Sequence, residues 1–262
     1  IKEPFYEYLP AKKTTSRYTP GDDRAIRKIP EWFEYEGDGY LSRHSTLESN
    51  GDSLVDSYAR IYELSGSRMQ VLPARHSLSI VGSDKNLLIK QDTVSYIACQ
   101  SPVISGRWYV PATVTSHDGG GRVQSTKEIL IRDDYGNPIE IVTNHSEHVI
   151  YLWGYYGQRL VAQIKGATYV EVENALGTSP VSLSQLFSPV STISGLQARL
   201  PGAQVYTYTY HPYAGVDSET APNGQTTCYD YDAKGRLVKS YRTGENGKQE
   251  ILQLNNYHII NE

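Results

Sequence analysis

The most compact set of catalytic residue types in the sequence is Ser116-His117-Asp118, which is followed by Gly119-Gly120-Gly121. Serine, histidine and aspartate are the nucleophile, base and orienting acid of many hydrolases, and a glycine-rich loop could form an oxyanion hole. Triad members, however, meet in space from separate elements, and no Gly-x-Ser-x-Gly elbow precedes a helix here. The spacing therefore predicts a polar hairpin tip rather than a catalytic centre.

His145 and His148 are the best candidates for metal ligands, with Glu147 between them and Asp133 and Asp134 upstream. Residues three apart in a strand face opposite sides of the sheet, so both imidazoles could reach one ion only from a turn. No third ligand clusters with them in the sequence. We therefore expect a solvated loop, with no metal and no cofactor.

Two pairs of carboxylates, Glu34/Glu36 and Asp230/Asp232, have the residue types of a glycosidase. The acid and the nucleophile of such an enzyme normally flank the substrate from different elements, whereas residues two apart in a strand share one face. Turn and surface roles are enough to explain both pairs. No catalytic residue is predicted, and the chain is not expected to be an enzyme.

Cys99 and Cys228 are the two cysteines of the chain. They are too few for a disulfide framework and lack the clustered spacing of a zinc site. Free cysteine is among the most buried residue types, which favours two separate buried thiols. One long-range bridge between them is the alternative.

Aromatic side chains recur at alternate positions of two expected strands. Residues 205–210 alternate with tyrosine at every second position, so three tyrosine rings share one face. One hypothesis is a platform on which sugar rings stack; the other is packing inside the sheet, since cross-strand aromatic pairs stabilise hairpins by up to about 1 kcal/mol each. The candidate platform consists of Trp153, Tyr206, Tyr208, Tyr210, Tyr229 and Tyr231.

Strands are the elements expected to position these residues. The chain has 262 residues, with 22 Gly, 13 Pro and 22 Tyr against 3 Phe and 3 Trp. Tyrosine favours half-buried sheet surfaces, and Gly and Pro mark turns. The length allows one large β domain, or two ordinary ones, with a sizeable core.

Charge and hydropathy argue against several classes of partner. The net charge is −4, whereas binding to nucleic acid or anionic lipid rewards a clustered positive patch. No apolar run approaches the roughly 20 residues that cross a bilayer, so neither nucleic-acid binding nor membrane insertion is expected. The chain begins at Ile1 and its only methionine is Met69, so the initiator and any secretion signal are expected to lie outside it.

Turn signals and periodicity divide the chain into three segments. Residues 1–30 contain four prolines and no sustained period, which predicts an irregular lead-in. Residues 31–127 predict a β meander, because Asx-Gly turns separate alternating runs. Residues 128–262 predict a second β region with a helical insert at about 174–201. We expect one continuous unit, mainly β, built as an antiparallel hairpin meander.

The helical insert is predicted from apolar spacing close to the helical period. Ser191 or Ser194 could cap its last helix before Pro201-Gly202 ends it. Its few apolar residues cannot build a core alone, so it should pack on a face of the sheet.

The clearest hairpin unit runs from Tyr229 to Leu237. Asp232 can hydrogen-bond its own backbone at the bend, and Gly235 can adopt the positive φ that the reversal needs. Hairpins stacked in series, each buried only against its neighbours, are the expected architecture. The structural repeat turns are predicted at Gly136, Gly157, Gly224, Asp232 and Gly235.

From about residue 128 onward, the order of these motifs resembles the bacterial RHS/YD-repeat family, whose name refers to such Tyr-Asp units. The motifs are Tyr135-Gly136-Asn137-Pro138, Trp153 to Gln158, Tyr208 to Pro212, Asn223-Gly224 and Tyr229 to Asp232. The resemblance covers the C-terminal part of the chain, and the N-terminal part matches only loosely.

The resemblance implies a large secreted or surface-associated bacterial protein whose repeats wind a β-sheet into a shell around a variable C-terminal toxin. The core segment that closes such shells is not found before Glu262, so neither a toxin nor an autoproteolytic aspartate pair is carried over. The leading hypothesis is a non-catalytic structural or interaction module, extracellular or at the cell surface, with a protein or a glycan as partner. The alternatives are a glycan-binding module and a hydrolase with an unrecognised site.

Overall fold

The computed structural model describes residues 9–18, 25–37, 39–65, 68–100, 102–103, 106–212, 214–244 and 247–257, and the side chains of all of these except 25–27, 62–65, 68–70 and 107. Within these ranges the protein contains sixteen strands and four short helices. Consecutive strands are hydrogen-bonded neighbours in chain order, and the pairings described are antiparallel. The prediction of a mainly β, antiparallel meander with a small helical insert is confirmed.

The strands belong to two compact units. Unit 1 comprises Ile1–Cys99 and Gly106–Lys127, and unit 2 comprises Gln100–Ser105 and Glu128–Glu262.

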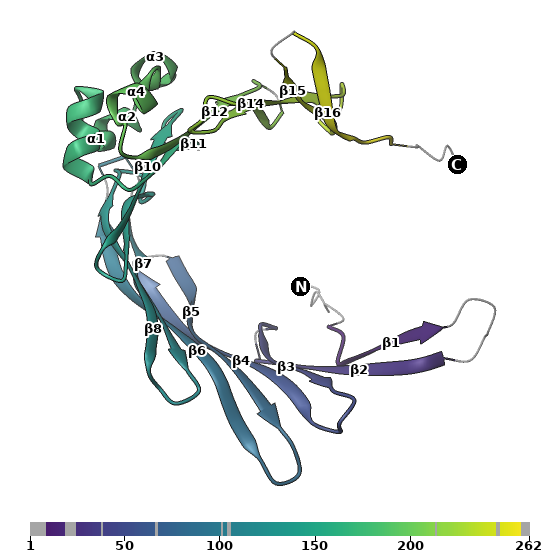
Figure 1. Ribbon diagram of the computed structural model, residues 1–262. Coiled ribbons are helices and arrows are strands. Elements are labelled where there is room, and N and C mark those ends of the chain that lie inside the picture. The colour runs from purple at the N-terminus through teal and green to yellow at the C-terminus, as the bar shows by residue number, and fades with distance from the viewer. Residues whose placement is uncertain are drawn as a thin grey trace, which may run out of the picture. The chain divides into compact units, whose positions relative to one another are not determined.

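Unit 1 is a succession of long hairpins (Figure 1). Its strands are β1 (Lys12–Tyr18), β2 (Ala25–Tyr35), β3 (Leu41–Leu47), β4 (Ser53–Ser65), β5 (Arg68–Val81), β6 (Asn86–Gln100), β7 (Arg107–Asp118) and the first part of β8 (Val123–Arg132).

The prediction of an irregular lead-in over residues 1–30 is wrong where the structure describes that segment. Strand β1 pairs with β2, and Thr14 lies opposite Pro30. The reason is that β1 is exposed on nearly all of its length, so neither of its faces carries the apolar side chains that would give a period of two. Pro4 and Pro20 lie outside the described residues.

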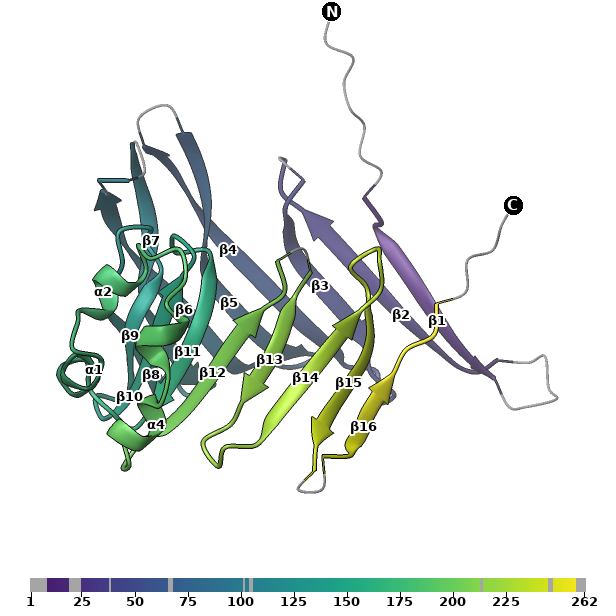
Figure 2. The ribbon, with the colours of Figure 1, turned by 90° about the horizontal axis from the view of Figure 1, so that it is seen from above.

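Unit 2 continues the meander and carries all four helices (Figure 2). After β8 come β9 (Pro138–Thr143), β10 (Glu147–Gly154) and β11 (Arg159–Lys165), then α1 (Tyr169–Leu176), α2 (Pro180–Leu183), α3 (Val190–Ile193) and α4 (Leu196–Arg199). The last strands, side by side in chain order in Figure 2, are β12 (Gln204–Tyr210), β13 (Val216–Thr220), β14 (Thr226–Tyr231), β15 (Leu237–Thr243) and β16 (Gln249–Leu254).

The main core lies where the helices cover strands β9 to β12. Fully buried aliphatic side chains of the helices, such as Val172 and Leu183, join those of the strands in one cluster. The strand side of the cluster includes Ile139, Ile150, Leu152, Val161 and Ile164, each 0% exposed. The insert therefore packs on the sheet and does not form a core of its own.

The helical insert begins earlier than the sequence predicts, at Tyr169 rather than near residue 174. Thr168 and Glu171 form a capping box in which each side chain accepts from the other residue's backbone N–H. At the other end, α4 has Gly195 as its N-cap and no side-chain cap, and α3 has none either, so Ser191 and Ser194 do not have the predicted capping role.

One type of turn recurs through both units. The backbone N–H of the fourth turn residue donates to the carbonyl of the first, and the N–H of the first donates to the carbonyl of the fifth. The fourth residue is always a glycine with φ between 72° and 87°. This is a three-residue hairpin loop with a left-handed glycine. Within the described chain it occurs seven times, at residues 36–40, 48–52, 118–122, 133–137, 221–225, 232–236 and 244–248.

Three of these turns begin with an aspartate that caps them. In each, carboxylate Oδ1 accepts from the backbone N–H groups two and four residues later, at 2.8–3.0 Å. The second oxygen, Oδ2, accepts from a nearby side chain, which for Asp232 is Arg236 at 2.8 Å. The capping residues are Asp118, Asp133 and Asp232.

Candidate functional site

The structure does not assemble the Ser116, His117 and Asp118 side chains into a catalytic triad. Ser116 Oγ donates to the carboxylate of Asp92 on β6. Asp118 accepts hydrogen bonds from the backbone of its own turn. The hairpin-tip prediction agrees with this geometry, since adjacent residues of a strand point to opposite faces.

His145 and His148 contact different carboxylates. His145, in the turn after β9 with φ 61°, lies 3.2 Å from Glu128. His148 Nδ1 lies 2.8 Å from Oε1 of Glu140, which is buried and also accepts from the backbone N–H of Tyr169. Glu140 thus joins the sheet to the first turn of α1. Among the residues that the structure describes, no group of three or more possible ligands is placed to hold a metal ion.

The other residues singled out for chemistry have structural surroundings. Glu34 lies 3.9 Å from Arg43, and Asp230 is paired with Lys239 at 2.8 Å. Cys99 and Cys228 are both free and half-buried.

Five titratable groups form a ladder across β2 to β6 of unit 1. Its members are Glu31, His44, Asp56, His76 and Asp92, one from each successive strand. The Nε2 atom of His44 lies 3.2 Å from Glu31, and its Nδ1 lies 3.6 Å from Asp56. The Nε2 atom of His76 lies 2.8 Å from Asp56, and its Nδ1 lies 3.9 Å from Asp92. Each imidazole therefore lies between two carboxylates.

An aromatic ring covers each histidine of this acid–histidine ladder. Phe33 stacks on His44 at 4.8 Å between ring centroids, and Tyr58 stacks on His76 at 4.9 Å. Each ring lies directly opposite its histidine in the strand register and two residues after a ladder carboxylate. The same acid-x-aromatic pattern, Glu31-x-Phe33 and Asp56-x-Tyr58, is therefore used twice.

The environment of the ladder changes the pKa of its outer carboxylates. The hydrogen bond with His44 lowers the pKa of Glu31, against burial, and Lys13 lowers it further. Burial raises the pKa of Asp92, but hydrogen bonds from Ser116 and Lys90 together hold it below the ordinary value. Both carboxylates favour the charged form.

The predicted tyrosine platform is a half-buried part of the sheet. Tyr208 lies opposite Glu219, and Glu219 lies opposite Thr227, so the strand register places Tyr206, Tyr208 and Tyr229 on one face. Burial is the main cause that raises the pKa of Tyr208 and of Tyr229. All three rings are half-buried on this face of the sheet.

Several polar atoms of the platform are used inside the protein. The Tyr210 hydroxyl donates to the carbonyl of Leu160 at 2.6 Å, and the Tyr231 hydroxyl donates to that of Val216 at 2.7 Å. Trp153 Nε1 donates to the Pro138 carbonyl at 2.8 Å. The structure thus places several of the predicted residues on one face of the sheet and engages the polar atoms of Tyr210, Tyr231 and Trp153 within the protein.

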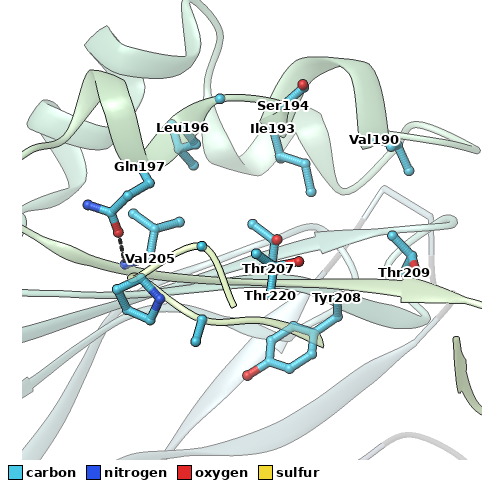
Figure 3. A pocket seen from close by; sticks show the side chains of 14 residues that line it. Val190, Ile193, Ser194, Leu196, Gln197, Val205, Thr207, Tyr208, Thr209 and Thr220 are labelled. Carbon is cyan, nitrogen blue, oxygen red and sulfur yellow. Dashed lines mark hydrogen bonds between the residues drawn. The ribbon is translucent and has the colours of Figure 1, made fainter. Parts of the chain in front are cut away.

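A groove of about 330 Å³ separates α3 and α4 from β12 and β13. In Figure 3, Ile193 and Leu196 point from the helices toward the strand, where Val205 and Thr207 face them. Tyr208 points to the opposite side of the strand (Figure 3). No carboxylate, imidazole or amine is among the residues that line this groove, which is an apolar slot with hydroxyls on its floor.

A second hollow, of about 490 Å³, lies at the end of the β10–β11 hairpin. Phe187 lies 6.1 Å from both Tyr155 and Tyr156, measured between ring centroids, and Tyr155 lies 6.0 Å from Tyr210. The Arg159 guanidinium stacks on the Tyr210 ring at 4.7 Å. We call this site the aromatic hollow; it is lined by Tyr155, Tyr156, Arg159, Phe187, Tyr210 and His211, with a few smaller contacts.

The turn that presents two of these rings is strained. Tyr155 and Tyr156 have φ values of 54° and 58°, in the left-handed region that bulky residues rarely adopt. Gly157 follows with φ 72°, so this turn differs from the seven others and Gly157 is not equivalent to Gly136 or Gly235. Strained backbone of this kind persists only where surrounding structure holds it, and it concentrates at functional sites.

Three hydrogen bonds hold the strained turn. The backbone N–H groups of Tyr156 and Gly157 donate to the carbonyls of Leu186 and Ser184, after α2. Asn137 Nδ2, from one of the aspartate-capped turns, donates to the Gly157 carbonyl at 2.7 Å. The helical insert and a repeat turn therefore fix the aromatic rings jointly.

The sequence alone does not indicate that Tyr155, Tyr156, Arg159 and Phe187 line one site. The pair Tyr155-Tyr156 before Gly157 was a signal for a turn, but nothing in the sequence indicated that both tyrosines are left-handed. Phe187 comes from the insert, and only the folded chain brings it to the hairpin.

No family model matches the chain, and no curated protein matches it. Among solved structures, the chain is similar to TcdB2-TccC3 without its hypervariable C-terminal region, at 11% identity and a TM-score of 0.35, over 93% of this chain and 12% of that one. A Tc holotoxin pore of Photorhabdus luminescens gives 8% identity and a TM-score of 0.21, over 93% of this chain and 20% of that one.

A porin-like protein from Bacteroides uniformis gives 11% identity and a TM-score of 0.23, over 92% of this chain and 93% of that one. All of these TM-scores lie below 0.5, so the likenesses carry no argument about fold or function. The architecture is argued from the strands and turns of the chain itself.

Proposed function

We propose that the chain is a non-catalytic structural and interaction module of a secreted or surface-associated bacterial YD-repeat protein. Its repeated glycine turns, three of them capped by aspartate, support a scaffold role. Its acid–histidine ladder adds to this, because the carboxylates and imidazoles contact one another across neighbouring strands. In such an architecture each hairpin is stabilised by the hairpins beside it.

The observation that carries the proposal is the outer strand β16. All six of its residues are exposed, including Ile251 at 57%, Leu252 at 45% and Leu254 at 61%. In the described part of the chain, β16 pairs with β15 alone. An exposed apolar edge strand is a template for pairing with another strand. The proposed interaction is thus addition of a further strand or hairpin to this edge.

Sedimentation of the purified chain over a range of concentrations tests the interaction. Wild type is expected to associate reversibly, and the double variant Ile251→Lys/Leu254→Lys to remain monomeric, because charge on an edge strand opposes edge-to-edge pairing. Val123→Lys, a change at another exposed apolar residue, is the control. Wild type that stays monomeric at millimolar concentration, or association that the edge variant does not alter, would contradict the proposal.

Assays on ester, peptide and glycoside substrates test the non-catalytic part. No turnover is expected. The hydrolase alternative would be favoured if the chain turned over one of these substrates and if Ser116→Ala or His148→Gln abolished that turnover without changing the melting temperature. The same proposal includes a location outside the cell or at its surface, and a protein or a glycan as the partner. Within the described residues, no helix is long and apolar enough to cross a membrane.

A further inference from the structure

We propose that the aromatic hollow is a binding site for an acidic sugar, such as a uronic acid residue of a polysaccharide. This goes beyond the scaffold role and does not depend on it. It also differs from the tyrosine platform predicted from the sequence, of which only Tyr210 lines the hollow.

The first argument is the arrangement of the rings. Phe187 is 69% exposed and Tyr156 is 52% exposed, although both are large aromatic side chains. Neither ring is needed to fill the core of unit 2, yet both are held beside Tyr155 at one hollow. Exposed apolar surface that is gathered at one concave place marks a binding site.

The second argument is that the strained turn presents these rings at a cost. Two successive tyrosines in the left-handed region are strained relative to relaxed backbone. A glycine or asparagine at either position would be relieved of most of this strain. The turn nevertheless has tyrosine at both positions, and both side chains line the hollow. The hydrogen bonds from Asn137 and to the carbonyls of the insert hold it in place before a ligand arrives.

The third argument concerns charge. Arg159 is the permanently charged side chain that lines the hollow, and no carboxylate lines it. The guanidinium is stacked on Tyr210, and no ion pair to it is found in the described chain. Stacking fixes the plane of the guanidinium and leaves its N–H groups able to bind a carboxylate in a bidentate manner. A ligand with a negative charge beside an apolar face matches this combination.

The chemistry favours an acidic sugar over an acidic peptide. A pyranose ring offers C–H faces to aromatic rings and a carboxylate to arginine. A peptide can gain affinity by adding a strand to a free sheet edge, and β11 offers no such edge because it is already paired with β10 and β12 on its two sides. The volume of about 490 Å³ is typical of a pocket for a small ligand.

Calorimetric titration tests the site with digalacturonic acid, with a neutral galactose disaccharide and with a hexaglutamate peptide. The uronate is expected to bind at least about tenfold more tightly than the neutral sugar, because a charge-assisted bidentate pair contributes that much or more. Arg159→Gln should remove this preference. Phe187→Ala should weaken binding of the uronate by about tenfold, while Tyr257→Ala, which removes an exposed ring elsewhere in unit 2, should not change it.

The melting temperature of each variant is measured alongside, since Phe187 is exposed and its loss should not unfold the protein. The proposal is overturned if the uronate does not bind, if its affinity is unchanged in both Arg159→Gln and Phe187→Ala, or if only the peptide binds. Self-association through β16 is measured separately, so failure here leaves the scaffold proposal standing.

Discussion

At the scale of single residues, turn chemistry explains much of this chain. Asp232 Oδ1 accepts from the backbone N–H groups of Lys234 and Arg236, and Gly235 has φ 74°. The sequence was sufficient to place these two residues, because an aspartate at the start of a loop and a glycine at its end have few other stable arrangements. The strained Tyr155-Tyr156 turn could not be predicted, because tertiary hydrogen bonds and not local preference impose it.

Replacing Gly235 by valine should destabilise unit 2 by about 1–3 kcal/mol, because a β-branched residue at positive φ is forced into a sparsely populated region. Lys234→Val, one position earlier on the exposed tip, should change stability much less. Thermal melts of both variants check this. Equal midpoints would mean that the left-handed position of the turn is not at Gly235.

Replacing Asp133 by alanine should cost about 1–3 kcal/mol, because this carboxylate is 5% exposed and its loss leaves the N–H groups of Tyr135 and Asn137 without their acceptor. Asp217→Ala, at an exposed position of β13, is the matched control in the same unit. Urea unfolding measures both. A loss no larger for Asp133→Ala than for Asp217→Ala would argue against the capping role.

At the scale of elements, most strands could be predicted from the sequence. Exposed and polar strands could not, because they lack the alternation of apolar and polar residues on which the prediction depends. Strand β1 has no apolar face, and ladder residues such as His76 and Asp92 put polar side chains where alternation would put apolar ones. The ladder itself depends on the register of five strands, which single-strand patterns do not contain. The start of α1 could have been predicted from Thr168-x-x-Glu171, which is the sequence pattern of a capping box. The spacing of the apolar residues alone does not indicate it.

The ladder predicts acid sensitivity in unit 1. The pKa of Glu31 is lowered in the folded protein, chiefly by the hydrogen bond with His44. Its stabilising contribution is therefore complete above the unfolded pKa of about 4.3 and is lost as pH falls through the lower folded value. Glu31→Gln should flatten the fall of the melting temperature below about pH 4. Glu34→Gln, an exposed change on the same strand, is the control; identical acid limbs in wild type and Glu31→Gln would exclude this contribution.

The capping box of α1 offers a separate test of the helical insert. Thr168→Ala should destabilise unit 2 by about 1 kcal/mol, since it removes the side-chain acceptor of the Glu171 N–H. Thr178→Ala, after the end of the same helix, should have little effect. Chemical denaturation followed by circular dichroism compares them, and equal stabilities would show that the box contributes nothing.

At the scale of the whole molecule, the strands pair in chain order, and each is stabilised by its neighbours. Sequence periodicity was enough to predict a meander of hairpins, because each connection is short and local. It could not predict which strands form the best-buried core, since that depends on where the helical insert lands. The helices cover β9 to β12, the side chains of β13 to β15 are mostly half-buried, and β16 is exposed at every residue.

Hydrogen exchange of backbone amides in the intact chain measures how strongly each strand depends on its neighbours. The slowest exchange is expected at buried positions of β10 and β11, such as Ile150, Leu152 and Ile164, with intermediate protection in the half-buried strands β13 to β15 and the least in β16. Amides of β16 that exchange as slowly as those of β10 would contradict this, because β16 would then have to be covered by a contact that is not found among the described residues.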